Sequence, residues 1–140
     1  MITTTLPLPP AAETLADMLP HFAQLEPILD ALPDVVFFVK DYETRYVLVN
    51  RTLAMRCGCK EKRALLGKTA GEVFPSRFGG VYMAQDKMVL AEGGPMIDQL
   101  ELHLYPGRQP GWCLSSKVPL RNKAGEVVGL AGISRDLNAN

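Results

Sequence analysis

The sequence lacks an excess of charge of either sign, because its 15 Lys and Arg residues match its 15 Asp and Glu residues. Proteins that bind nucleic acid through its phosphates normally carry a basic excess or a basic stripe. It also lacks any run approaching the roughly 18–20 apolar residues that cross a bilayer. Its N-terminus has no charged opening followed by an apolar run, as a secretory signal peptide would. We therefore expect no direct nucleic-acid binding, no membrane contact and a cytoplasmic location.

Cysteine is scarce, and the three present are an odd number. This argues against a disulfide framework and fits a reducing compartment. Cys57 and Cys59 are close enough to suggest a metal site, but structural zinc needs four converging nitrogen or sulfur ligands. Cys113 is far along the chain, and neither His21 nor His103 is near the pair. We expect no metal.

Catalytic signatures are absent as well. The chain has no nucleophile elbow, no HExxH and no phosphate-binding glycine loop. The pairs Gly79-Gly80 and Gly93-Gly94 lack the lysine and following Ser or Thr that a P-loop needs. The sequence therefore does not predict an enzyme.

Apolar residues make up 47% of the 140 residues, which is enough for the core of one domain. Residues 1–10 are rich in Thr and Pro, and we expect them to be disordered. Residues 11–32 repeat apolar side chains at helical spacing, which predicts an amphipathic helical arm that Pro20 and Pro27 bend or divide. The folded domain is expected over residues 33–138.

Within the domain, alternating and helical patterns follow one another in a definite order. Asn50 is expected to cap the helix that follows the second strand, because its side-chain oxygen accepts the orphan backbone donors. Antiparallel strands at both ends with helices between them predict an α+β domain. The expected elements are strands 35–40 and 45–49, helical segments 51–57, 60–66, 69–74 and 76–92, and strands 99–104, 112–120 and 127–135.

Several short segments carry a resemblance to a known family. The PAS fold is similar in element order, and it implies a five-stranded antiparallel sheet with helices across one face, enclosing a pocket. The segments are Leu32-Pro33-Asp34, Tyr46 to Arg51, Leu65 to Thr69, Glu72 to Pro75, Val118 to Asn122, Gly125 to Leu130 and Ser134 to Leu137.

The sequence segments FFVKD and GLAGISRDL further resemble PAS segments at the N-terminus of AraC-type bacterial transcription regulators. No helix-turn-helix pair is found, and the chain stops where the PAS pattern hands over to an output segment. We therefore expect a truncated chain or a stand-alone sensor.

This resemblance implies a signal-sensing domain that binds a small molecule, mediates dimerisation, or does both, to regulate an attached output domain. The alternative is a ligand-free dimerisation module or the input domain of a sensor histidine kinase. The sequence does not identify a cofactor. Segment 66–70 lacks the cysteine of covalent flavin photoreceptors, and helix 76–92 lacks the histidine that oxygen-sensing relatives give to haem.

The pocket prediction centres on Gln85, an amide in the middle of the apolar face of helix 76–92. A buried amide without a partner costs about 1–3 kcal/mol, so a ligand, a water or a backbone carbonyl must satisfy it. Trp112 is either a core residue or a stacking surface, and His103 is expected on the solvated side of its strand. The pocket candidates are Gln85, Tyr82, Phe78, Met88, Ser116, Trp112 and Ser134.

The arm offers the candidate dimer interface. Leu15, Leu19, Phe22 and Leu25 form an apolar stripe, and such a stripe left in water usually marks a contact surface. The resemblance to PAS proteins implies that such an arm either pairs across a dimer or covers the outer face of the sheet, and we expect a homodimer through the arm.

Overall fold

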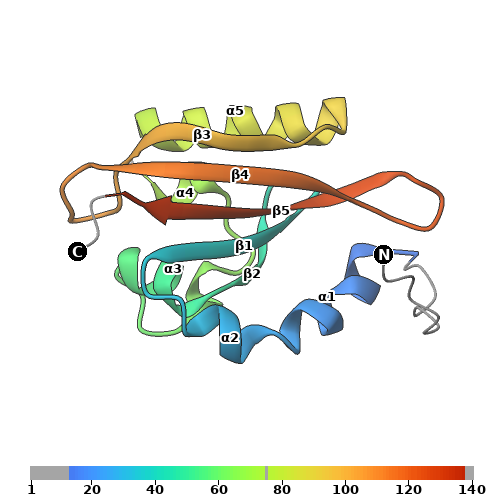
Figure 1. Ribbon diagram of the computed structural model, residues 1–140, viewed down its shortest axis with the longest axis horizontal. Helices are drawn as coiled ribbons and strands as arrows, with labels where there is room; N and C mark the ends of the chain where they lie inside the picture. The colour runs from blue at the N-terminus through green and yellow to red at the C-terminus, as the bar shows by residue number, and fades with distance from the viewer. Residues whose placement is uncertain (1–12, 75, 138–140) are drawn as a thin grey trace, which may run out of the picture.

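The computed structural model describes residues 13–74 and 76–137, and within them five strands form one antiparallel sheet in the order β2-β1-β5-β4-β3 (Figure 1). The disorder expected for residues 1–10 lies outside the described residues. The elements are α1 (Leu15–Ala23), α2 (Glu26–Asp30), β1 (Val35–Asp41), β2 (Tyr46–Val49), α3 (Arg51–Arg56), the 3-10 turn η1 (Lys62–Leu65), α4 (Ala70–Val73), α5 (Ser76–Glu92), β3 (Met96–His103), β4 (Gly111–Arg121) and β5 (Val127–Asp136). The expected α+β class and five-stranded antiparallel sheet are confirmed.

Short polar side chains fix where the helices begin. Asn50 caps α3 by accepting from the backbone N–H of Leu53, as expected, and also accepts from the N–H of Phe37 at 3.0 Å. Its amide donates to the carbonyls of Leu29 and Val35. Because one side chain satisfies four backbone groups, Asn50 ties α2, β1 and α3 together.

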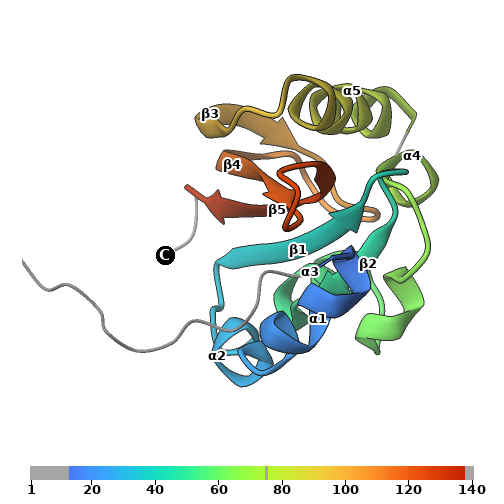
Figure 2. The same ribbon diagram turned by 90° about the vertical axis from the view of Figure 1, so that its right-hand side faces the viewer.

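The sheet has two different faces (Figure 2). Its inner face packs against α3, α4 and α5 and forms the main apolar core. Along β1, Phe38 and Lys40 point to this inner side. Phe37 and Val39 point to the outer side, where α1 covers them. This alternation is the period of two expected of a strand.

The helical arm divides into α1 and α2 between Ala23 and Glu26, so that of its two prolines only Pro27 stands at the start of a helix. Pro20 lies inside α1, and Pro27 lies in the first turn of α2, where a missing N–H costs nothing. Leu15, Leu19 and Phe22 pack against Val39, Leu48 and Ala131 of the same chain.

This packing corrects the expected role of the arm stripe. Three of its four residues are partly buried against their own sheet, and only Leu25 stays exposed. Of the two positions implied by the resemblance, the dimer contact was preferred because the sequence does not show that the outer side of β1 and β5 is also apolar; the structure shows the other position, on the outer face of the sheet.

None of the described helices is both long enough and apolar enough to cross a membrane.

Candidate functional site

A cavity of about 30 Å³ lies between the inner face of the sheet and the helices. Every strand and the helical layer contribute to its wall. The lining residues are Val36, Phe38, Lys40, Tyr46, Leu53, Phe74, Tyr82, Glu101, His103, Tyr105, Lys117 and Ser134.

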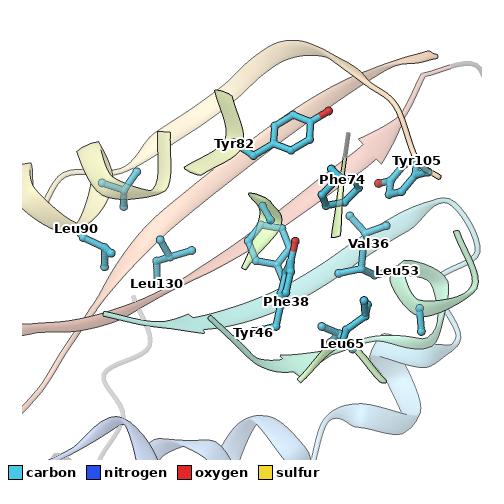
Figure 3. Packing of buried hydrophobic residues seen from close by; sticks show 14 residues of the cluster. Val36, Phe38, Tyr46, Leu53, Leu65, Phe74, Tyr82, Leu90, Tyr105 and Leu130 are labelled. Carbon is cyan, nitrogen blue, oxygen red and sulfur yellow. The ribbon is translucent and has the colours of Figure 1, made fainter. Parts of the chain in front are cut away.

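Aromatic rings make up much of this wall (Figure 3). The ring of Phe74 meets the ring of Tyr82 edge to face, with 5.2 Å between centroids. The imidazole of His103 lies 4.9 Å from the Tyr82 ring, again between centroids. Phe38 and Tyr46 form a second edge-to-face pair at 5.9 Å. These pairs favour tilted and edge geometries because the faces of the rings are electron-rich and their edges are not.

Two lysines share one carboxylate at the edge of the cavity. Lys40 of β1 donates to one oxygen of Asp86 of α5, and Lys117 of β4 donates to the other at 2.7 Å. Asp86 is fully buried, and the two lysine side chains are 2% and 5% exposed. Burial lowers the pKa of Lys40 to about 8, and the charge of Lys117 adds to this, although Asp86 opposes it.

A hydrogen-bond chain continues from Lys117 across the cavity wall. Its ammonium donates to Oε1 of Gln85 at 3.2 Å, and the amide nitrogen of Gln85 donates to Glu101. His103 Nε2 lies 3.2 Å from the other oxygen of Glu101. Burial raises the pKa of Glu101, but hydrogen bonds from His103, Ser115 and Gln85 outweigh it and hold the pKa at about 2. Glu101 is therefore an acceptor at neutral pH.

The structure brings some of the expected pocket residues together. Tyr82 and Ser134 line the cavity, and Phe78 packs beside Tyr82 with 6.4 Å between ring centroids. Gln85 belongs to the hydrogen-bond chain behind the wall. Its partners are side chains, a possibility the sequence reasoning did not include.

Three other pocket candidates lie elsewhere. Met88 is 58% exposed on α5, and Trp112 is 49% exposed on the outer face of the sheet. The hydroxyl of Ser116, on the same face of β4, accepts from the backbone N–H of Asp98. Both strand residues were misplaced because their strand alternates in the opposite phase, with Cys113, Ser115 and Lys117 pointing inward.

His103 also lies opposite to its expected side. On β3 the polar residues Glu101 and His103 face the cavity, while Leu100 and Leu102 are exposed on the outer face. The usual rule that apolar side chains of a half-buried strand point inward is inverted here. The inversion follows from the inner wall, where Gln85 and Tyr82 offer partners to a polar strand face.

Sequence reasoning missed Lys40, Asp86, Glu101 and Lys117. A signal for one of them was present. Lys40 continues the inward series of Val36 and Phe38 at every second position. A charged residue in phase with core positions must be paired if it is buried, and that pairing is what the structure shows.

A second hollow of about 320 Å³ adjoins the cavity and shares His103 and Tyr105 with it. Arg56, Arg108 and Gln109 lie on its far side. The guanidinium of Arg56 is 3.7 Å from a carboxylate oxygen of Asp136 and lies 5.8 Å from the centre of the Tyr105 ring. His103 and Tyr105 thus line both the cavity and this neighbouring cleft, which also carries two arginines and Asp136.

The cysteines lie outside this network as free thiols. Burial raises the pKa of Cys57 to about 12 and that of Cys113 to about 11, so both stay protonated at neutral pH. In the part of the chain that the structure describes, no three His, Cys, Asp or Glu side chains converge as metal ligands do.

Comparison with known proteins agrees with this architecture. The family model described as "PAS fold" matches residues 29–139. The methanogenesis regulatory histidine kinase FilI of Methanothrix harundinacea is 29% identical over an alignment of 137 residues that covers 90% of this chain and 15% of the kinase.

Two solved structures of VqmA are similar in fold. VqmA bound to DPO has a TM-score of 0.69 and 23% identity, covering 86% of this chain and 57% of VqmA. The VqmA dimer of Vibrio cholerae, a LuxR-type receptor, has a TM-score of 0.68 and 23% sequence identity, covering 86% of this chain and 51% of VqmA. The chain therefore spans only part of the length of these relatives. With the family model covering most of its residues, the chain belongs to the PAS-fold family.

Proposed function

We propose that this domain binds a small molecule in its inner cavity and reports occupancy to an attached output domain, without catalysing a reaction. The observation that carries this proposal is the buried cluster of Lys40, Asp86 and Lys117 at a cavity lined by aromatic rings. A domain that only held two partners together would need no such cluster.

The energetics of the cluster support this interpretation. Taking charges out of water costs several kcal/mol per ion, and well-packed apolar residues often replace a buried ion pair without loss of stability. The lowered pKa of Lys40 is a direct sign of that cost. Buried ionisable groups shifted by burial and a specific partner are typical of functional sites. We therefore attribute the cluster to ligand recognition.

Access to the cavity is proposed to run through the wall that His103 and Tyr105 form. A volume of about 30 Å³ holds about two water molecules, so a larger ligand requires this wall to move toward the open cleft. The bound arrangement would then differ from the empty one. A ligand shifts such an equilibrium only as far as it binds one arrangement better.

The output domain is proposed to be an AraC-type transcription regulator, as the sequence resemblance implies, or the kinase part of a sensor histidine kinase. The kinase FilI supports the second, and VqmA, a LuxR-type receptor, supports regulation of transcription in general. We propose a cytoplasmic location for either protein, and a bacterial source for the AraC-type regulator.

A homodimer is part of this proposal, in line with the VqmA dimer. Leu15, Leu19 and Phe22 of the arm are occupied within the chain, and we propose that a partner instead binds an apolar surface on the outer face of the sheet. This outer strip consists of Leu100, Leu102, Trp112, Val118 and Ile133, all at least 36% exposed. A second copy would bury it.

Native mass spectrometry of the freshly purified chain tests the function directly. We expect a dimer mass and an additional small-molecule mass that heating releases. A dimer with no adduct, and no thermal stabilisation by a metabolite library, would instead establish the ligand-free module.

A further inference from the structure

The hydrogen-bond chain of the cavity wall has a donor-rich end. Among the described residues, the ammonium of Lys40 has one hydrogen-bond partner, Asp86. An ammonium carries three N–H donors. The ammonium of Lys117, in contrast, donates both to Asp86 and to Gln85. Lys40 therefore keeps the larger number of unused donors at the edge of the cavity.

The local charge points in the same direction. Two ammonium groups share the single carboxylate of Asp86. Glu101, the carboxylate that lines the cavity, accepts a hydrogen bond from the amide of Gln85, and His103 Nε2 lies 3.2 Å from its other oxygen. At the Lys40 end of the hydrogen-bond chain there are thus more donors than acceptors, whereas at the Glu101 end the carboxylate already accepts from its neighbours.

The surroundings of Lys40 are aromatic. Its nitrogen lies 4.6 Å from the ring centre of Tyr46 and 5.0 Å from that of Phe38. These ring contacts stabilise the charge but do not accept its N–H groups as an oxygen would. Flat rings can stack or meet edge to face in such a wall.

We propose that the ligand is a small, flat ring that carries an acceptor oxygen, and that this oxygen accepts a hydrogen bond from Lys40. This inference rests on the proposed function and adds the chemical class of the ligand. Lys40 is the specificity-determining residue, and Lys117 holds Asp86 in place.

Two probes of nearly the same size distinguish the contribution of the oxygen to binding from that of the ring. 2-Pyridone has a carbonyl oxygen on its ring, and toluene has a methyl group at the corresponding place. Their dissociation constants are measured for the whole chain by saturation-transfer NMR at pH 7. Because hydrogen bonds to charged groups contribute about 1.5–3 kcal/mol, wild type should bind 2-pyridone at least tenfold more tightly than toluene.

The matched variants are Lys40→Met and Lys117→Met, each of which removes one ammonium from the same carboxylate. We expect the preference for 2-pyridone to disappear in Lys40→Met and to persist in Lys117→Met, with circular dichroism confirming that both fold. A second readout needs no variant. In wild-type protein labelled with ¹³C-lysine, 2-pyridone should shift the Cε signal of Lys40 more than that of Lys117.

Equal binding of the two probes would overturn this inference and leave a ring-binding cavity intact. A preference that survives in Lys40→Met, or binding of neither probe, would also overturn it. The proposed function itself fails separately, when native mass spectrometry shows no adduct and no metabolite of the library stabilises the chain against heat.

Discussion

Lys40 and Lys117 lie on strands that are not neighbours in the sheet, yet they donate to the two oxygens of one buried carboxylate. Asp86 of α5 is therefore the point at which β1, β4 and the long helix are joined. The pairing is demanding, because removing the carboxylate leaves two ammonium groups in a dry site.

Asp86→Asn should destabilise the domain by about 3–5 kcal/mol, the usual cost of breaking a buried ion pair from one side. Urea unfolding followed by circular dichroism measures this free energy. Glu92→Gln, on the same helix but exposed, is the control and should change it by less than about 0.5 kcal/mol. A loss under about 1 kcal/mol in Asp86→Asn would show that Lys40 is not held as a charged group.

Glu101 should make the stability depend on pH in the acid range. Its pKa falls from the ordinary 4.5 to about 2 on folding, so the unfolded chain binds the proton more tightly. The stabilisation is therefore complete above about pH 4.5 and is lost as the pH falls toward 2.

The comparison of wild type with Glu101→Gln isolates this group. We expect the difference in their free energies of unfolding to be constant between about pH 7 and 5 and to shrink below about 4.5. A difference that stays unchanged down to pH 3 would mean that the hydrogen bonds from His103, Ser115 and Gln85 do not favour the charged carboxylate.

Asn50→Ala should cost about 2–4 kcal/mol, more than a simple helix cap, because four backbone groups lose their partner. Thermal and urea unfolding measure the loss. Gln99→Ala removes an amide from an exposed position of β3 and serves as the control. If the two variants lose similar stability, the junction of α2, β1 and α3 does not depend on this side chain.

Leu100→Asp tests the outer strip as a dimer surface. A charge in the middle of an apolar contact should weaken self-association at least tenfold, seen as a shift from dimer to monomer in light scattering at micromolar concentration. Met88→Asp places the same charge on an exposed apolar position of α5 and should leave the dimer intact. Equal dissociation in both variants, or a monomeric wild type, contradicts the assignment.

The order of the elements could be predicted from the sequence because its signals are local. Asn50 before α3 and Pro27 at the start of α2 act within a few residues, and the structure agrees with both signals. The polar wall of the cavity could not be predicted in the same way. Period-two alternation identifies two faces of β3, but which of them lies inward depends on Tyr82 and Gln85, which belong to another element.

The same reasoning explains why Trp112 and Met88 were misplaced. Large apolar side chains are usually core residues, but here Trp112 belongs to the exposed outer strip and Met88 lies exposed on α5. Lys40 is the opposite case, a charged side chain that is buried. Although it is in phase with Val36 and Phe38, a lysine at this position predicts the exposed end of a strand unless its partner on α5 is known.

Strand β1 places Phe38 and Lys40 at the cavity and Phe37 and Val39 beneath α1. One layer of backbone therefore separates the cavity from the N-terminal arm. In the proposed ligand-bound arrangement, a shift or rotation of β1 would also move the residues against which α1 packs. Under the proposed function, the signal would then pass through β1 itself, with no relay of side chains across the sheet.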